Sequence, residues 1–145
     1  TIEGDLRETH DVEVPVERAA RFLVGDALHL PFPDASFDTV LALNLVDRVP
    51  DPGRALDELG RVVRDGGRLL VASPYTWLAT FTPRARWLGG FSDDTGPVHG
   101  HRTVRNHFAG AFELLDERRL PFFIPHHARS GQLGVAHVQT FRRTR

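Results

Sequence analysis

The sequence predicts an α/β fold built around a parallel sheet, and three neighbouring segments carry that prediction. Residues 39–43 form a continuous apolar run of strand length, which is typical of a parallel strand buried on both faces. Residues 51–65 show helical periodicity, and residues 69–72 form a second apolar run. Strand, helix and strand in this order make a βαβ unit, whose crossover is expected to be right-handed.

The predicted helix has recognisable ends. Asp51 stands at the N-cap position and Pro52 at the first helical position, a favoured start. Gly66 and Gly67 are expected to end the helix. Apolar residues recur between these ends at spacings of three and four, which places on one face Ala55, Leu56, Leu59, Val62 and Val63.

The other elements follow from shorter patterns. Residues 21–24 are apolar and stop at a Gly-Asp turn, which predicts a strand, and the alternation of Val12 and Val14 suggests an edge strand. Residues 103–110 suggest a helix, with loops expected over 73–82 and 89–100. Two late segments are rich in β-branched and aromatic residues and predict an antiparallel pair at one sheet edge, joined by a polar connection: 112–118 and 135–141.

Composition excludes several classes of protein. The chain has 145 residues, enough for one domain, and with 41% hydrophobic and 26% charged residues it is not expected to be disordered. Its 18 basic residues against 19 acidic ones argue against nucleic-acid binding through bulk charge. No apolar run is long enough to cross a membrane, no signal peptide is evident, and the default location is cytoplasmic. The absence of cysteine excludes disulfides and thiolate chemistry.

The sequence lacks the motifs of metal sites, serine hydrolases, and phosphate- or dinucleotide-binding loops. The pairs His99-x-His101 and His126-His127 have no carboxylate at ligand spacing, so exposed loop histidines and no metal site are expected. Ser73 has no G-x-S-x-G setting, and the chain contains neither a P-loop nor a G-x-G-x-x-G motif.

Polar and aromatic residues follow each of the three predicted strands. In doubly wound sheets ligands bind beyond the carboxyl ends of the strands, so these groups are expected to meet in one crevice. Asp26 is an acceptor for an amine or hydroxyl, or merely a turn residue. Tyr75 and Trp77 offer faces for a planar ring, or pack onto the sheet. The three groups are Gly25, Asp26 and Ala27; Asn44, Asp47 and Arg48; and Ser73, Pro74, Tyr75, Thr76 and Trp77.

Taken in order, these residues resemble the class I S-adenosylmethionine-dependent methyltransferases. Residues 25–40, which begin Gly25-Asp26-Ala27, look like the acidic motif after the family's third strand running into its fourth. Residues 64–71 look like the entry to the fifth strand. A narrower match covers most of the chain and is similar to the methyltransferase domain of ovothiol biosynthesis enzymes, the 4-mercaptohistidine N1-methyltransferases. It consists of Asn44-Leu45-Val46-Asp47-Arg48, Ser73-Pro74-Tyr75-Thr76-Trp77-Leu78, 81–83, 87–91, 120–124, Arg129 and 141–143.

The resemblance implies a Rossmann-like doubly wound sheet and a role for each motif residue. S-adenosylmethionine would be the cofactor, bound by Gly25, Asp26, Ala27, Asn44 and Leu45, with the Asp26 carboxylate on the adenine amine. The implied catalytic residues are Asn44, Asp47 and Tyr75: Asn44 beside the reacting centre and Asp47 orienting an N–H group. Tyr75 and Trp77 would form the walls of a pocket for a thiolated imidazole, whose carboxylate Arg129 would bind. No metal is implied.

The implied function is methyl transfer to an imidazole nitrogen of a thiol-histidine, a small-molecule substrate. Two alternatives stay open, a methyltransferase acting on another small molecule and a non-catalytic remnant that serves as a binding module. The family's first strands and Gly-rich loop have no counterpart before Asp26. Residues 1–145 are therefore expected to be the C-terminal portion of one methyltransferase domain, and the 21–24 strand is expected to lack neighbours. The resemblance to ovothiol enzymes leaves open a fusion to, or pairing with, an upstream sulfoxide synthase domain.

Overall fold

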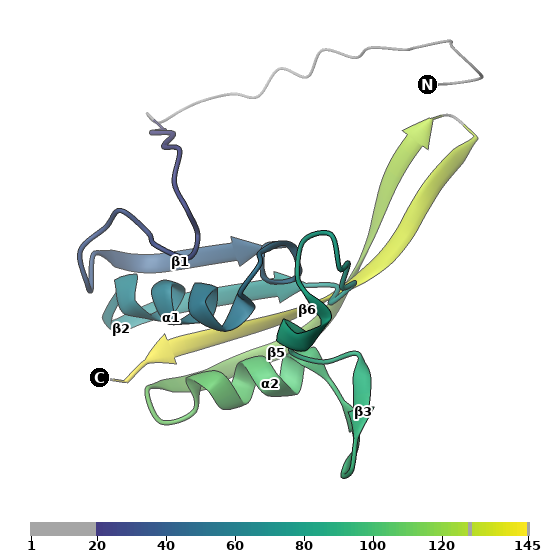
Figure 1. Ribbon diagram of the computed structural model, residues 1–145. Coiled ribbons are helices and arrows are strands. Elements are labelled where there is room, and N and C mark those ends of the chain that lie inside the picture. The colour runs from purple at the N-terminus through teal and green to yellow at the C-terminus, as the bar shows by residue number, and fades with distance from the viewer. Residues whose placement is uncertain (1–19, 128, 145) are drawn as a thin grey trace.

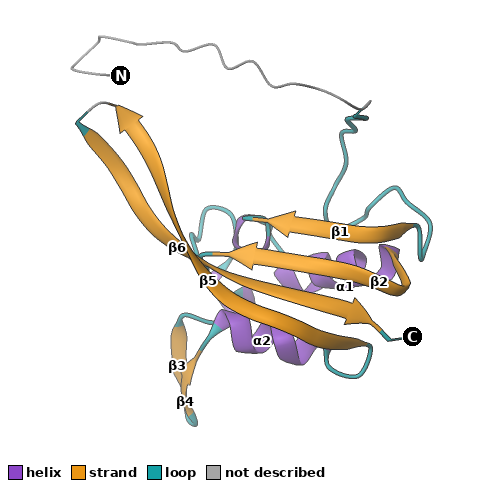
Figure 2. Cartoon of the chain, turned by 180° about the vertical axis from the view of Figure 1, so that it is seen from behind, coloured by secondary structure: helices purple, strands orange, loops and turns teal. Residues whose placement is uncertain are grey.

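A mixed four-stranded sheet carries both helices on one of its faces in the computed structural model, which describes residues 20–127 and 129–144 (Figures 1 and 2). The sheet order is β1-β2-β6-β5, and β3 and β4 form a separate two-stranded hairpin. The segment around Val12 and Val14 lies outside the described residues. The elements are β1 (Phe37–Leu43), the 3-10 helix η1 (Val46–Arg48), α1 (Pro52–Val62), β2 (Val63–Ser73), the 3-10 helix η2 (Arg84–Arg86), β3 (Phe91–Asp93), β4 (Gly96–Val98), α2 (Gly100–Phe108), β5 (Phe112–His127) and β6 (Ser130–Arg143).

The predicted α/β class and its strand–helix–strand unit are confirmed. Strands β1 and β2 pair in parallel with Leu41 opposite Leu70, and α1 connects them. At the start of α1, the Asp51 carboxylate accepts a hydrogen bond from the Arg54 amide at 3.1 Å, as an N-cap should. The predicted end at Gly66 is wrong, because α1 stops at Val62 and the chain passes directly into β2.

The predicted antiparallel pair is also confirmed, but its strands are much longer than expected. Strands β5 and β6 pair from Phe112 opposite Arg143 to His127 opposite Ser130. The polar connection predicted between them is wrong, because those residues continue both strands into a hairpin whose outer end projects beyond the sheet (Figures 1 and 2). Glycine makes close ring packing possible there: a Cβ atom on Gly134 would lie 2.4 Å from the Phe122 ring.

The hydrophobic core lies between the sheet and the two helices. Its largest member from the last strand is Phe141, 1% exposed, whose ring lies 5.1 Å from that of Phe108 in α2. Seen from behind, the described residues leave the opposite face of the sheet without a helix (Figure 2). Leu41 and Leu43 of β1 are therefore 60% and 59% exposed. The buried cluster comprises Ala42, Val46, Leu56, Leu59, Val63, Leu69, Val71, Trp77, Val104, Phe108 and Phe141.

The strand predicted over residues 21–24 does not form. Phe22 is 94% exposed and Val24 is fully exposed, and no residue of the segment belongs to a strand. A strand needs a neighbour to pair its backbone groups and to cover its apolar side chains. Within the described residues this segment has no such neighbour, as the sequence analysis expected.

A buried carboxylate fastens the loop before β1 to helix α1. Glu58 accepts hydrogen bonds from the Leu30 amide at 2.8 Å and from Arg61 at 2.7 and 2.9 Å, and only 6% of its side chain is exposed. Arg61 also donates to the carbonyl oxygens of Leu30 and Phe32. The hydrogen bonds from Arg61, opposed by burial and aided by the Leu30 amide, lower the pKa of Glu58 to about 2.

This lowered pKa makes stability depend on acid in a defined direction. A carboxyl whose pKa is lower in the folded state stabilises the fold above its ordinary pKa and stops doing so as the pH falls toward 2. We expect the wild-type protein to lose on the order of 2 kcal/mol of unfolding free energy from this group between about pH 5 and pH 2. Glu58→Gln should lack that component in urea titrations across this range, whereas Glu113→Gln, at an exposed carboxyl, should retain it. Equal acid sensitivity of Glu58→Gln and the wild type would contradict this account.

None of the helices in the described part of the chain is long and apolar enough to cross a membrane.

Candidate functional site

The segments that follow β1 and β2 are joined by Asp47, a fully buried residue of η1. Its Oδ2 accepts hydrogen bonds from the Thr76 amide at 2.9 Å, from the Thr76 hydroxyl at 3.2 Å and from Arg48 at 2.8 Å. Arg48 donates in turn to the Thr76 carbonyl oxygen and hydroxyl. Two of the three polar groups predicted from the sequence therefore meet at the carboxyl ends of neighbouring parallel strands.

Two residues at these strand ends adopt left-handed backbone conformations. Asn44 has φ 53° and Tyr75 has φ 52°, values that non-glycine residues rarely take and that recur at functional sites. The Asn44 amide donates to the Ala72 carbonyl oxygen at 2.8 Å, and its side chain is exposed. The Tyr75 amide donates to the Ser73 hydroxyl at 3.0 Å. The turns thus present an amide side chain and a phenol at one edge of the sheet.

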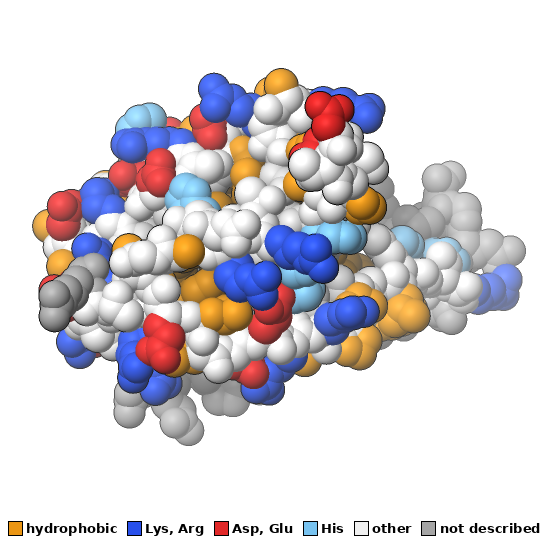
Figure 3. Space-filling view, turned by 90° about the horizontal axis from the view of Figure 1, so that it is seen from below, with side chains coloured by type: hydrophobic (Ala, Val, Ile, Leu, Met, Phe, Trp, Pro, Cys, Tyr) orange, Lys and Arg blue, Asp and Glu red, His pale blue; other side chains and the backbone are white. Residues whose placement is uncertain are grey.

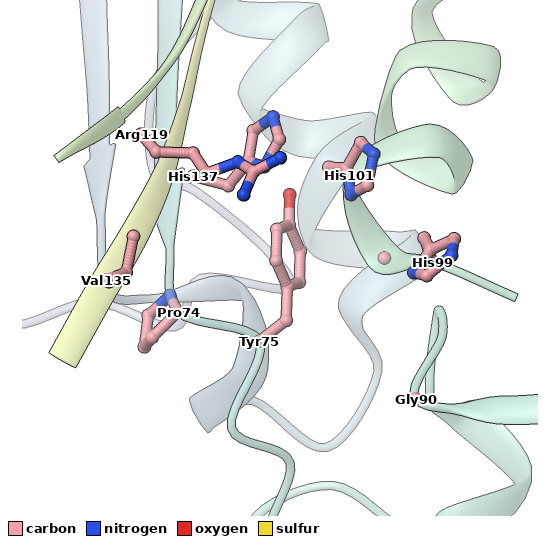
Figure 4. A pocket seen from close by; sticks show the side chains of 9 residues that line it. Pro74, Tyr75, Gly90, His99, His101, Arg119, Val135 and His137 are labelled. Atoms are coloured by element: carbon pink, nitrogen blue, oxygen red, sulfur yellow. The ribbon is translucent and has the colours of Figure 1, made fainter.

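Two cavities open at this edge, one on each side of Pro74. The first, of about 430 Å³, is lined by Asn44, Arg48 and Thr76 and by the middle of the β5–β6 hairpin, at residues 122, 124 and 132–135. The second, of about 390 Å³, lies between Tyr75, the start of α2 and strands β5 and β6, and Figure 4 shows its lining side chains. Pro74 and Val135 line both cavities, so a small ligand that spans them would touch both strand ends.

The phenol of Tyr75 points into the second cavity, toward His137 and Arg119 (Figure 4). Its oxygen is buried and has no hydrogen-bond partner among the described residues. Burial, together with the negative charges of Asp47 and Glu117, raises the pKa of Tyr75 well above its ordinary value. The hydroxyl therefore keeps its proton at neutral pH and can donate a hydrogen bond to a ligand. Gly100 makes room for the ring, since a Cβ atom there would lie 2.5 Å from it.

The third predicted group, Gly25, Asp26 and Ala27, does not line either cavity. The Asp26 side chain is 61% exposed and accepts from the Leu28 amide at 2.9 Å, with His29 Nδ1 at 3.2 Å. The Leu28 amide and then His29 lower the pKa of Asp26, so the group is a carboxylate at neutral pH. Among the described residues this third group therefore stands apart from the other two, in a segment that has no strand to hold it beside them.

Three further residues of the predicted site line neither cavity. Trp77 is 8% exposed and stacks on Trp87 with ring centroids 6.2 Å apart, so it belongs to the core rather than to a pocket wall. Leu45 packs against the same core. Arg129 lies at the turn of the β5–β6 hairpin, where its backbone amide donates to His127, and it lines neither cavity.

A group of ionisable residues that is not among the predicted site residues lies beside Tyr75. His137 Nε2 lies 2.5 Å from Glu117 Oε1, and the His101 ring stacks on that of His137 at 4.2 Å. Gln139 donates to Glu117 at 3.3 Å and to the His101 carbonyl oxygen at 3.0 Å. The predicted exposed loop position is wrong for His101, which is half-buried at the start of α2.

This group contains three potential metal ligands, His101, Glu117 and His137, whose ligand atoms lie within 4.8 Å of one another. The orientation of the rings opposes a shared ion. The two imidazoles are nearly parallel, at 7°, and each ring nitrogen binds a metal in its own ring plane at about 2.0–2.1 Å. Two stacked planes 4.2 Å apart cannot both direct such lone pairs at one point. The arrangement instead favours exchange of a proton.

The alternation of side chains along β5 and β6 is the sequence pattern from which this group could be predicted. Side chains two apart on a strand share a face, as Glu117 and Arg119 do on β5. The register of the hairpin then sets His137 opposite Arg119 and Gln139 opposite Glu117. That register requires both strands to be extended through residues that the sequence analysis assigned to a polar connection.

Comparisons with known proteins fit this geometry. Residues 5–71 match the family model described as a methyltransferase domain. An uncharacterized methyltransferase of Mycobacterium sp. (strain KMS) is 35% identical over 119 residues, which are 78% of this chain and 46% of that protein. A phosphatidylethanolamine N-methyltransferase of Cereibacter sphaeroides is 46% identical over 63 residues, 43% of this chain and 31% of that protein.

Solved structures share the fold. A SAM-dependent methyltransferase from Methanosarcina mazei superimposes with a TM-score of 0.55 at 20% identity, covering 82% of this chain and 65% of that one. The YcgJ protein of Bacillus subtilis gives a TM-score of 0.52 at 14% identity, covering 83% and 70%. The chain is thus similar in sequence to methyltransferases over part of its length, and similar in fold to solved ones. The predicted Rossmann-like fold is confirmed, and the chain spans about half the length of the curated relatives it matches.

This relationship also supports the predicted cofactor, S-adenosylmethionine. The residues present fit its chemistry. Asp26 offers an exposed carboxylate for an amine, and Asn44 offers an exposed amide at the carboxyl end of β1. Leu41 and Leu43 expose apolar surface on the adjoining face of the same strand. An acidic acceptor, an amide and apolar surface are groups suited to a nucleoside that carries an amino-acid chain.

Proposed function

We propose that this chain is the C-terminal portion of a methyltransferase domain that transfers a methyl group from S-adenosylmethionine to an imidazole nitrogen of a thiol-histidine, as in ovothiol biosynthesis. The observation that carries the proposal is the pair of cavities at the carboxyl ends of β1 and β2, where ligands bind in sheets of this kind. A relative named as an N-methyltransferase supports nitrogen as the acceptor atom. The proposal also expects a sulfoxide synthase domain, fused to or paired with this chain.

The protein's part in this reaction is mainly alignment. The cofactor supplies a methyl group already activated on a sulfonium. Holding two reactants in line contributes about 7–11 kcal/mol to such a step. Gly25, Asp26, Ala27, Asn44 and Leu45 would hold the cofactor, and Tyr75 would donate a hydrogen bond to the acceptor. Asp47 would act on both by fixing the segments that carry Asn44 and Tyr75 relative to each other.

The test is methyl transfer to a defined acceptor. Incubating the protein with S-adenosylmethionine and 4-mercapto-L-histidine should yield a product methylated at one imidazole nitrogen, identified by mass spectrometry and NMR. Asn44→Ala should lower the rate by about 100-fold if this residue aligns the donor. Asn106→Ala, at an exposed position of α2, is the matched control and should leave the rate unchanged. Methylation of a different small acceptor, with none on 4-mercapto-L-histidine, would refute the substrate proposed here.

A further inference from the structure

We propose that Glu117 and His137 form the proton-accepting pair of the acceptor pocket, and that Arg119 beside them binds a carboxylate group of the methyl acceptor. This inference rests on the proposed function and narrows it to a class of acceptor: a small molecule that carries a carboxylate and must lose a proton as it is methylated. Arg119 and His137 face each other on strands β5 and β6 and line the cavity that Tyr75 enters (Figure 4). Glu117, two residues before Arg119 on β5, lines an adjoining cavity that His101, Arg119 and His137 also line.

The Glu117–His137 contact defines which ring nitrogen is available. Because Nε2 of His137 lies 2.5 Å from the carboxylate, its N–H donates there, and the lone pair of the neutral ring is then on Nδ1. Nδ1 of His137 has no hydrogen-bond partner among the described residues. An imidazole oriented by a carboxylate, with its second nitrogen free, is the arrangement of a general base. Glu117 is itself oriented by Gln139 at 3.3 Å and Arg105 at 3.6 Å.

The neighbouring ionisable groups leave His137 as the proton acceptor. Burial and then the neighbouring His137 ring lower the pKa of His101, so the stacked partner stays neutral. Tyr75 keeps its proton, as described above. The groups that face His137 are Glu117 and Arg119 from β5, His101 from α2 and Tyr75 from the segment after β2. Glu117 alone among them carries the negative charge that stabilises an imidazolium.

Arg119 is the residue that would bind the carboxylate of the methyl acceptor. Other arginines nearby are paired, Arg118 with Asp116 at 2.6 Å and Arg105 with Glu117. The Arg119 side chain has no hydrogen bond or ion pair among the described residues, yet it lines both cavities that contain His101 and His137. Seen from below, histidine side chains lie among arginine and acidic side chains on this face (Figure 3). An unpaired guanidinium in a pocket suits a carboxylate, which it can bind through two parallel hydrogen bonds.

The proposed reaction releases a proton, which the Glu117–His137 pair would accept. As the acceptor nitrogen bonds to the methyl carbon, the carbon–sulfur bond breaks and its electron pair stays on sulfur. The methylated imidazole would be left as a cation, and its N–H proton passes to Nδ1 of His137. The products would be S-adenosylhomocysteine, an acceptor whose methylated imidazole ring is neutral, and a His137 imidazolium held against the Glu117 carboxylate, which later returns the proton to water.

Binding probes test the pocket without turnover. Imidazole-4-acetate and 4-methylimidazole share the ring and differ in the carboxylate. In NMR titrations of ¹⁵N-labelled protein, the first should shift the His137 ring nitrogens and bind about tenfold more tightly. Arg119→Gln should remove that difference, whereas Arg64→Gln, at an exposed arginine that lines neither cavity, should keep it. Equal affinity of the two probes for the wild type, or shifts confined to the hairpin turn at Arg129, would overturn the role of Arg119.

The same spectra report the state of His137. Its Nε2 should carry the proton of the neutral ring, and Nδ1 should be unprotonated. The reversed tautomer would overturn the base assignment.

With 4-mercapto-L-histidine, His137→Gln should lower the single-turnover rate about 100-fold and abolish its rise with pH, with the acceptor KM nearly unchanged. His107→Gln removes a similar imidazole–carboxylate pair, 3.0 Å from Asp57, outside the pocket, and should leave the rate unchanged. If the wild type does not methylate this acceptor, the proposed function fails while the NMR arm still decides the present inference.

Discussion

Asp47→Ala is expected to lower the free energy of unfolding by about 3 kcal/mol, because it removes a buried carboxylate that accepts three hydrogen bonds, one of them from a charged guanidinium. The Thr76 amide and the Arg48 guanidinium would lose their acceptor, and the segments after β1 and β2 would no longer be tied together. Urea denaturation at neutral pH, with the slope compared between variant and wild type, measures the change.

Asp57→Ala provides the matched control for this prediction. Asp57 is also an aspartate paired with a basic side chain, but it is 57% exposed, and exposed pairs contribute about 0–1 kcal/mol. A stable Asp47→Ala protein with normal denaturation and no methyl transfer would contradict the bracing role described here. It would return Asp47 to the direct catalytic role that the sequence resemblance implies.

Arg143→Met is expected to lower the free energy of unfolding by about 2–3 kcal/mol. The guanidinium of Arg143 donates to the carbonyl oxygens of Val63 at 2.7 Å, Gly60 at 2.9 Å and Arg61 at 3.3 Å. These groups lie at the end of α1, where carbonyls have no partner within the helix and where a positive charge also favours the helix dipole. Methionine keeps the aliphatic stem and removes the donors.

Arg142→Met, one residue earlier on β6, is the control. Arg142 pairs with Glu113 across the strand, but both side chains are about half exposed, so its loss should change stability by less than about 1 kcal/mol. Hydrogen exchange should show faster opening of the last turn of α1 in Arg143→Met alone. Identical effects of the two substitutions would mean that Arg143 does not cap the helix.

The part of the fold that the sequence predicts well is the part determined by local pattern. The apolar run of β1, the Asp51 cap and the helical spacing of α1 each act within a few residues, and all three are present. The end of α1 was placed at Gly66, because a glycine is the local signal for a helix end. In the structure a residue from the last strand supplies the cap instead, an interaction across 80 or more positions that no local pattern contains.

The site residues likewise fall into those that local sequence pattern predicts and those that only long-range strand pairing brings together. Asn44 and Tyr75 were found because polar residues after parallel strands mark a ligand edge. Glu117, Arg119 and His137 were missed because their proximity depends on the register of two long strands. The resemblance implies that Trp77 forms a pocket wall, whereas its stacking on Trp87 places it in the core, in line with the packing role that the residues alone left open. For Asp26, the neighbours that would position a strand at 21–24 are absent from the described residues, and the side chain bonds locally.

The most direct test of the account is to locate the cofactor on the protein. Titrating ¹⁵N-labelled protein with S-adenosylhomocysteine should shift the backbone amides of Asn44 and Leu45 and of residues 25–27, with smaller shifts at 73–76. Amides of the outer β5–β6 hairpin should not move. Saturable binding with shifts that spare both 25–27 and 44–45, or no shift at any concentration, would contradict the claim that the carboxyl end of β1 holds the methyl donor.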